Sequence, residues 1–138
     1  ILGYLLKLIG IPEPSWGIVG RWTYYMLKNA TFFNPNIGKM PSFKYEILLG
    51  WFFHYYVSIC WAVIYYFCFI LVGFKMTYFS GFIFGALTTL APLFIFLPFT
   101  GQGILAKNTE IPVKTSFMFL IRHSIYGIAM YEGFRWFA

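Results

Sequence analysis

Charged residues are scarce in this 138-residue chain: 10% of its residues are charged, whereas 60% are hydrophobic and 25% aromatic. Ordinary soluble domains carry roughly 25% charged residues. The scarcity is concentrated, because no Lys, Arg, Asp or Glu occurs between Glu46 and Lys75 or between Lys75 and Lys107. A helix needs about 20 apolar residues to cross a bilayer. The composition therefore excludes a soluble globular protein and predicts an all-α integral membrane protein.

Residues that carry common catalytic chemistry are also few. Aspartate is absent and the four glutamates are spread along the chain, so neighbouring residues cannot form a carboxylate pair or a Ser-His-Asp triad. Cys60 and Cys68 lie in one apolar run without metal-binding spacing. The stretch 101–103 (Gly-Gln-Gly) lacks the third glycine of a phosphate loop. The sequence therefore favours a non-enzymatic role and predicts no metal and no cofactor.

The apolar runs predict a small helical bundle in a single membrane domain. We expect a partial span over residues 1–11, a helix at the membrane surface over 15–29, and full spans over 46–73, 77–99 and 115–138. Pro12 and Pro14 end the first segment, and Ser15 is a suitable N-cap for the next. Residues 30–45 and 100–114 are polar or rich in Gly and Pro, which is typical of connections.

Two features of the span over 77–99 predict how it packs. Gly81 and Gly85 are four residues apart, a spacing that lets a neighbouring helix approach closely. Pro92 interrupts the run. Because proline has no N–H group, we expect a kink near Pro92 and a carbonyl group near Thr88 without its helical partner.

The positive charges predict the orientation of the chain. The net charge of +6 does not indicate a nucleic-acid partner, because the charges flank apolar runs, where they interact with lipid headgroups. The connections on one side carry six Lys or Arg residues, whereas Lys75 and Arg135 lie on the other. Cytoplasmic connections are enriched in Lys and Arg. We therefore expect the long connections in the cytoplasm and membrane lipid as a partner.

Polar residues are expected to meet at one depth in the membrane. His54 lies eight residues after Glu46, and Arg122 and His123 lie seven and eight residues after Thr115, so all three are predicted about 10–12 Å below the cytoplasmic face. A charged arginine at this depth needs a partner, water or a headgroup. The candidate residues for ligand binding or a proton path are His54, Tyr55, Trp51, Thr89, Arg122 and His123. Residues expected at the membrane interface are Arg21, Trp22, Glu46, Gly101 and Gly103.

Several functions are compatible with this polar layer. The first is a membrane protein that binds or passes a small solute, a proton or a lipid around His54, Arg122 and His123. The second is an accessory or structural subunit of a larger membrane complex or a homo-oligomer. The third is a membrane enzyme, or a b-type haem protein with His54 and His123 as ligands. In a purely structural alternative, Arg122 extends to the headgroups and the imidazoles bind backbone carbonyls.

The order of five short motifs resembles a family of bacterial inner-membrane proteins that is classified as a domain of unknown function. The motifs are Gly20-Arg21-Trp22, Glu46-x-x-x-Gly50-Trp51-x-x-His54-Tyr55, Gly85-x-x-Thr88 with Ala91-Pro92, Pro98-x-x-Gly101-x-Gly103, and His123-x-x-x-Gly127. The resemblance implies a four-helix multi-pass protein in the bacterial inner membrane. It implies no biochemical activity.

Overall fold

The structure is a computed structural model that describes residues 15–73 and 75–137, which form helices and connections and no β-strand. The partial span predicted over residues 1–11 lies outside the described residues. The longer helices are α2 (Trp16–Asn29), α3 (Glu46–Val72), α4 (Tyr78–Thr88) and α6 (Pro112–Phe137). The short helical segments are η1 (Ile37–Lys39), η2 (Pro92–Phe96), α5 (Leu97–Phe99) and η3 (Ile104–Ala106). The prediction of an all-helical chain is confirmed for the described residues.

The first described helix begins where the local sequence signals place it. The Ser15 hydroxyl accepts a hydrogen bond from the Ile18 N–H at 3.4 Å and caps α2. At the C-terminal end of α3, Gly73 adopts a left-handed conformation with φ +67°. This conformation is readily available only to glycine, so α3 ends at Val72.

The segment predicted as one span over 77–99 is not a continuous α-helix. It begins with Thr77, which forms a reciprocal capping box with Ser80, and its α-helical geometry ends at Thr88. The wide π-helical turn of η2 then begins at Pro92, and the Leu97 N–H bonds to the Pro92 carbonyl five residues earlier. Proline cannot donate the hydrogen bond that would continue an α-helix. The departure from α-helical winding predicted at Pro92 is therefore confirmed, whereas the predicted kink and the unpartnered carbonyl near Thr88 stay predictions.

Helix α6 begins three residues earlier than predicted, at Pro112 instead of Thr115. Proline is favourable in the first turn of a helix, because N–H groups there have no intrahelical acceptor. The connection predicted over 100–114 is correspondingly shorter, and it contains η3.

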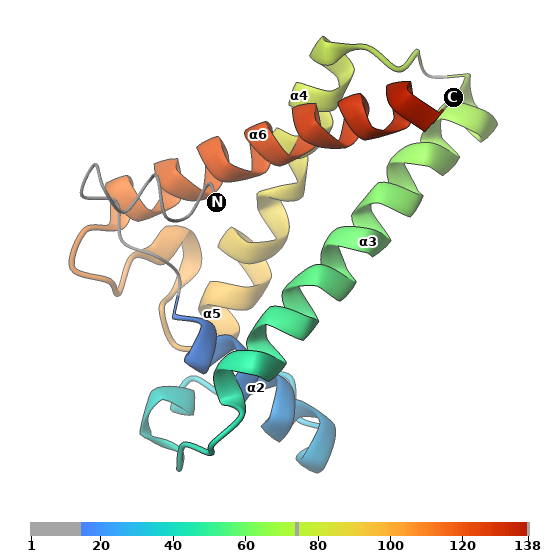
Figure 1. The fold of residues 1–138 in the computed structure, drawn as a ribbon. Helices are drawn as coiled ribbons and strands as arrows, with labels where there is room; N and C mark the ends of the chain where they lie inside the picture. The colour runs from blue at the N-terminus through green and yellow to red at the C-terminus, as the bar shows by residue number, and fades with distance from the viewer. Residues whose placement is uncertain (1–14, 74, 138) are drawn as a thin grey trace.

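The helices pack as two pairs, α2 on α3 and α4 on α6 (Figure 1). In the first pair, a Cβ atom on Gly20 would lie 1.7 Å from the Glu46 carbonyl oxygen, and one on Gly50 would lie 2.1 Å from the Trp16 carbonyl oxygen. No side chain fits at these distances. Glycine at both positions is therefore what allows the two backbones to touch.

The second pair crosses through the small-residue spacing identified in the sequence. A Cβ atom on Gly85 would lie 2.3 Å from the His123 carbonyl oxygen, and one on Gly127 would lie 2.1 Å from the Gly81 carbonyl oxygen. The predicted close approach of a helix at Gly81 and Gly85 is confirmed, and that helix is α6.

Aromatic side chains join the two pairs. The Tyr65 side chain on α3 is buried, and its hydroxyl lies 2.9 Å from the Ser80 hydroxyl at the start of α4. The Tyr65 ring packs against Phe84 with centroids 5.0 Å apart. Nearer the end of α3, Tyr66 stacks on Phe134 of α6. A small buried core lies beyond the C-terminal end of α4. It consists of Leu93, Leu97 and Ala106, with Phe96 and Phe119 packed against them.

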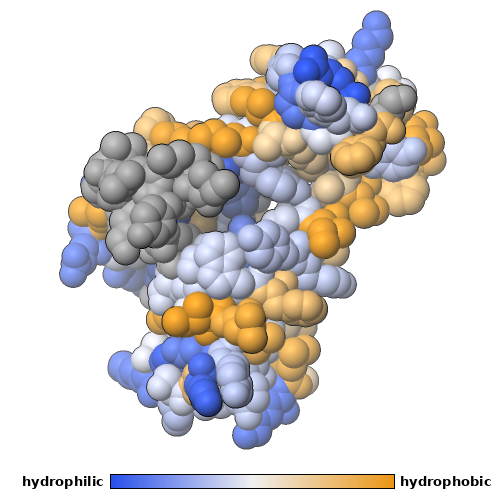
Figure 2. Space-filling model, viewed as in Figure 1, coloured by the Kyte–Doolittle hydropathy of each residue, from blue (hydrophilic) through white to orange (hydrophobic). Residues whose placement is uncertain are grey.

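The outer surface of these helices is apolar. Among the described residues, α3 and the segment Tyr78–Phe99 are long and apolar enough to cross a membrane. In the most apolar 18-residue stretch of each, only 6% of the residues of α3 and 28% of those of Tyr78–Phe99 are buried inside the protein. The core helix of a soluble protein would instead bury most of these residues. Figure 2 shows strongly hydrophobic residues between hydrophilic ones at the top and bottom of the visible face.

Helix α6 differs from these two segments. It is long enough to cross a bilayer, but it is not among the helices apolar enough to do so. The reason is that it carries Lys114, Arg122, Glu132 and Arg135. Length and hydropathy therefore support two spans in the described residues, whereas the sequence predicted three.

Candidate functional site

An ion pair fixes the start of α3 against α2. The Arg21 Nε atom donates to Glu46 Oε2 at 2.8 Å and the Nη2 atom donates to Oε1 at 2.9 Å. A third bond runs from Arg21 Nη1 to the Met40 carbonyl at 3.0 Å. The hydrogen bond to the Glu46 carboxylate raises the pKa of the Arg21 guanidinium. Both side chains are largely buried, so these two residues join the helices in addition to any contact with headgroups.

Trp22, which the sequence predicts at the membrane interface, is a packing residue. Its side chain is buried, its indole N–H donates to the Phe32 carbonyl at 2.7 Å, and its ring contacts Phe53 and Phe96. It therefore connects α2 to α3 and to η2. Tryptophan is common both at membrane interfaces and in buried contacts, so the interfacial position of Trp22 stays a prediction.

Gly101 packs the turn after α5 against the connection between α2 and α3, and Gly103 lies in the same turn. Both adopt a positive φ, and a Cβ atom on Gly101 would lie 2.2 Å from the Pro35 carbonyl oxygen. The Asn34 N–H donates to the Phe99 carbonyl at 2.8 Å in the same place. Gly101 therefore brings the two long connections together, whereas Gly103 lies against Lys107 and Asn108 of its own connection.

His54 belongs to an aromatic cluster on α2 and α3. Its ring contacts Trp16 with centroids 4.8 Å apart, and it also contacts Trp51 and Tyr55. Trp16 and Trp51 stack with centroids 4.2 Å apart. Trp51, His54 and Tyr55 are exposed residues on this face of α3.

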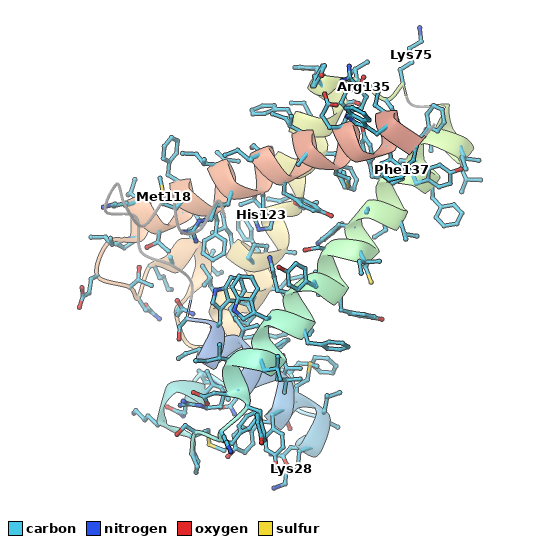
Figure 3. All side chains as sticks on the ribbon, viewed as in Figure 1. Lys28, Lys75, Met118, His123, Arg135 and Phe137 are labelled. Atoms are coloured by element: carbon cyan, nitrogen blue, oxygen red, sulfur yellow. The ribbon has the colours of Figure 1, made fainter. Side chains whose placement is uncertain are left out.

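His123 belongs to a different set of contacts, between α4 and α6 (Figure 3). Its Nδ1 atom lies 2.9 Å from the Thr88 hydroxyl, and that hydroxyl also donates to the Gly85 carbonyl at 2.7 Å. The neighbouring Thr89 side chain is buried, and its hydroxyl has no hydrogen-bond partner among the described residues. The Thr88–His123 bond thus links α4 to α6 just before the helical segment is interrupted.

The two histidines take part in different contacts. His54 contacts aromatic rings of α2 and α3, whereas His123 bonds to Thr88 and contacts the Phe119 ring. Within the described ranges, no three His, Cys, Asp or Glu side chains come together as a metal site. That His54 faces Arg122 or His123 in one shared pocket stays a prediction.

Arg122 lines a cavity of about 460 Å³. The cavity lies between the first turns of α2, the η1 segment, the junction of η2 and α5, the following connection and the first half of α6. Its polar lining residues other than the cations are Ser15, Asn36, Thr100, Gln102, Thr109 and Thr115. Its apolar lining includes Ile18, Val19, Phe96, Leu97, Ile111, Met118 and Phe119. This size falls within the range of about 300–1,000 Å³ that is typical of small-molecule sites.

The sequence prediction missed most of this cavity. The sequence indicates only that Ser15 caps a helix and that residues 100–114 form a connection. Gly101 is a signal in the sequence for part of this arrangement. A glycine with a positive φ often marks a turn that packs against another segment. Nothing in the sequence shows that Lys39 and Lys114 lie on the same cavity.

Residues 1–135 match the sequence pattern of a family described as a protein of unknown function, DUF2938. The chain belongs to the DUF2938 family. No curated protein and no solved structure matches it. The predicted resemblance to a family of unknown function is therefore confirmed.

The motifs that carried the resemblance contact each other in this DUF2938 protein. The first two motifs meet through Gly20 and Gly50 and through the ion pair of Arg21 with Glu46. The third and fifth motifs meet through Gly85 and His123. The motifs thus mark the contacts that set the positions of the helices.

Proposed function

We propose that this DUF2938 protein is a multi-pass protein of the bacterial inner membrane that binds a small ligand in its polar layer. The ligand is a solute, a proton with its water, or a lipid. The cavity lined by Arg122 is the observation that carries the proposal, because it is large enough for a small molecule and combines charged, polar and apolar walls.

The surface of the molecule supports a position across the membrane. The apolar side chains of α3 face outward, and Figure 3 places Lys75 and Arg135 at one end of the molecule and Lys28 at the other. The long connections carry most of the positive charge, which favours a cytoplasmic position for them. The cavity lies beside these connections and would open toward the cytoplasm.

The cavity adjoins the histidine layer through α6. Arg122 lines the cavity, and the next residue, His123, bonds to Thr88 at the helix crossing. A ligand bound beside Arg122 would therefore lie about one side chain away from the Thr88–His123 contact. This arrangement favours a route from the cavity toward His123.

A cavity-filling variant tests the proposal. Met118 lines the cavity, whereas Leu120 on the same helix is exposed and does not. We expect native mass spectrometry of the gently solubilised protein to show a bound molecule that Met118→Trp loses and Leu120→Trp retains. A protein that carries no bound molecule, or that carries the same one in all three forms, would contradict the proposal.

A role as a subunit is a second candidate, and one observation favours it. Tyr56 lies near the middle of α3 with 60% of its surface exposed. A phenol hydroxyl in the hydrocarbon core requires a hydrogen-bond partner. A second protein on this face would supply one. A native mass equal to a single chain in mild detergent, with no loss of stability in Tyr56→Phe, would exclude this candidate.

A further inference from the structure

The Thr88 hydroxyl determines which nitrogen of His123 carries a proton. A hydroxyl group has one proton to donate, and a carbonyl oxygen can only accept. The Thr88 hydroxyl donates its proton to the Gly85 carbonyl at 2.7 Å. The same hydroxyl lies 2.9 Å from His123 Nδ1, so it must accept in that contact. Nδ1 therefore carries a proton and donates it to Thr88.

The second ring nitrogen of His123 is then a hydrogen-bond acceptor. A neutral imidazole carries a single N–H group, so with the proton on Nδ1 the Nε2 atom holds a lone pair. Among the described residues no side chain or backbone group donates to Nε2. The side chain is half-buried and not enclosed. The helix crossing therefore presents one open acceptor.

The position of this acceptor is fixed by the packing of the two helices. A Cβ atom on Gly85 would lie 2.3 Å from the His123 carbonyl oxygen, so the backbones touch beside the ring. The Phe119 ring, one turn earlier on α6, contacts the imidazole with centroids 6.3 Å apart. With the Nδ1 bond to Thr88, these contacts hold the ring before a ligand arrives. Such preorganisation lowers the cost of binding.

The surroundings of His123 favour an uncharged donor. Its contacts are the Thr88 hydroxyl and the Phe119 ring, and no carboxylate of the described residues contacts it. A cationic donor such as an ammonium group needs a counter-charge in the membrane interior. A hydroxyl group donates a hydrogen bond without one. The acceptor is therefore better suited to a hydroxyl group than to an amine.

The same bonds oppose the passage of a proton through His123 to Thr88. A relay would move the Nδ1 proton to the Thr88 hydroxyl, which would then have to release its own proton to the Gly85 carbonyl. An amide carbonyl has no proton of its own to pass on. A proton that reaches Nε2 must leave from Nε2. Ligand binding therefore fits this geometry better than a relay.

We propose that His123 accepts a hydrogen bond at Nε2 from the hydroxyl group of an uncharged ligand. Thr88 is a positioning residue, because its bond to Nδ1 keeps Nε2 unprotonated in the neutral ring. No covalent bond forms or breaks in this step. The inference rests on the proposed function, and it names the chemical class of the ligand in the same polar layer.

Nitrogen NMR spectroscopy of the purified protein with isotopically labelled histidine tests the tautomer. The chain has two histidines, so His54→Gln identifies the signals of His123. In the neutral ring we expect a bonded proton on Nδ1 and none on Nε2. Thr88→Val should shift the tautomer ratio toward Nε2–H by about fivefold or more, the effect of losing one hydrogen bond, and Thr88→Ser should restore the wild-type ratio.

Thr89→Val is the matched control. Thr89 is the next residue, it is equally buried, and its hydroxyl has no hydrogen-bond partner among the described residues. This variant should keep the wild-type tautomer. A predominant Nε2–H tautomer in the wild type, or the same ratio in Thr88→Val and Thr89→Val, would overturn the proposal. The wild-type spectrum decides the question if Thr88→Val fails to fold, as judged by circular dichroism.

Phenol and anisole test the open acceptor, because they share an aromatic ring and only phenol has a hydroxyl proton. We expect phenol to move the Nε2 resonance of His123 and anisole to leave it in place. The response to phenol should be about fivefold smaller in Thr88→Val than in Thr89→Val. An equal response to both compounds, or none to either, would overturn the hydroxyl contact.

These outcomes are separate from the failure of the proposed function. That function fails if native mass spectrometry detects no bound molecule that Met118→Trp removes, whatever the tautomer of His123. Conversely, a bound molecule that Met118→Trp removes, together with an Nε2–H tautomer in the wild type, would overturn this inference and leave the ligand-binding cavity intact.

Discussion

The crossing of α4 and α6 depends on the absence of a side chain at Gly127. In Gly127→Ala, the new Cβ atom would lie 2.1 Å from the Gly81 carbonyl oxygen and 2.8 Å from the Gly85 Cα atom. Non-bonded atoms of this kind prefer separations of about 3.5–4.0 Å. The two backbones must therefore separate by about 1 Å or more for the alanine to fit.

The net effect on stability follows from two opposing contributions. Overpacking of this kind costs about 1–3 kcal/mol, whereas replacing a helical glycine by alanine gains up to about 1 kcal/mol from helix propensity. We expect Gly127→Ala to lower the free energy of unfolding by about 1–2 kcal/mol. The Thr88–His123 bond, one turn along the crossing, should weaken as the helices separate.

Gly133 on the same helix provides the control. A Cβ atom on Gly133 would meet nothing within 4 Å. Gly133→Ala should therefore keep the propensity gain and raise the free energy of unfolding by up to about 1 kcal/mol.

The measurement is unfolding by sodium dodecyl sulfate in mixed micelles, followed by the fluorescence of the five tryptophans and by circular dichroism. Opposite signs for the two alanine variants are expected. Equal stability of Gly127→Ala and Gly133→Ala would refute the reasoning, since the two substitutions differ only in what the new methyl group touches.

Three further predictions concern other parts of the molecule. Glu46→Gln should lower the free energy of unfolding by about 1–3 kcal/mol, and a double-mutant cycle with Arg21→Gln should show positive coupling, because a charge-assisted bidentate pair is lost; zero coupling would contradict this. Single cysteines at Lys39 and Lys107 should be protected from an impermeant reagent outside intact cells, and one at Lys75 should be labelled; the reverse pattern would invert the topology. The purified protein should show no Soret band, and its presence would revive the haem alternative.

Local signals predicted some features of the helices. Ser15 caps α2 as expected, and Pro92 interrupts the helical segment as expected, because a cap and a missing N–H group act within one turn of the chain. The sequence places Pro112 in a connection, whereas it is the first residue of α6. A proline within a polar stretch suits either a connection or the first turn of a helix.

The candidate site was predicted less completely, because depth along a helix does not determine the direction in which a side chain points. Moving the start of α6 to Pro112 places Arg122 ten residues into its helix, or about 15 Å, while His54 lies eight residues into α3, or about 12 Å. The rotation of each helix is set by tertiary contacts such as those at Gly50 and Gly127. These contacts turn His54 toward Trp16 and His123 toward Thr88.

The π-helical turn at Pro92–Phe96 makes the register of the chain sensitive to a single residue. Such a turn holds one residue more than an α-helical turn. Winding the same five residues as regular α-helix would advance every later position by about one residue, a rotation of about 100°. Leu97 would then leave the small core, and Thr100 would leave the cavity lining. Two homologous chains with the same hydropathy profile could therefore differ in whether they possess a binding cavity at all.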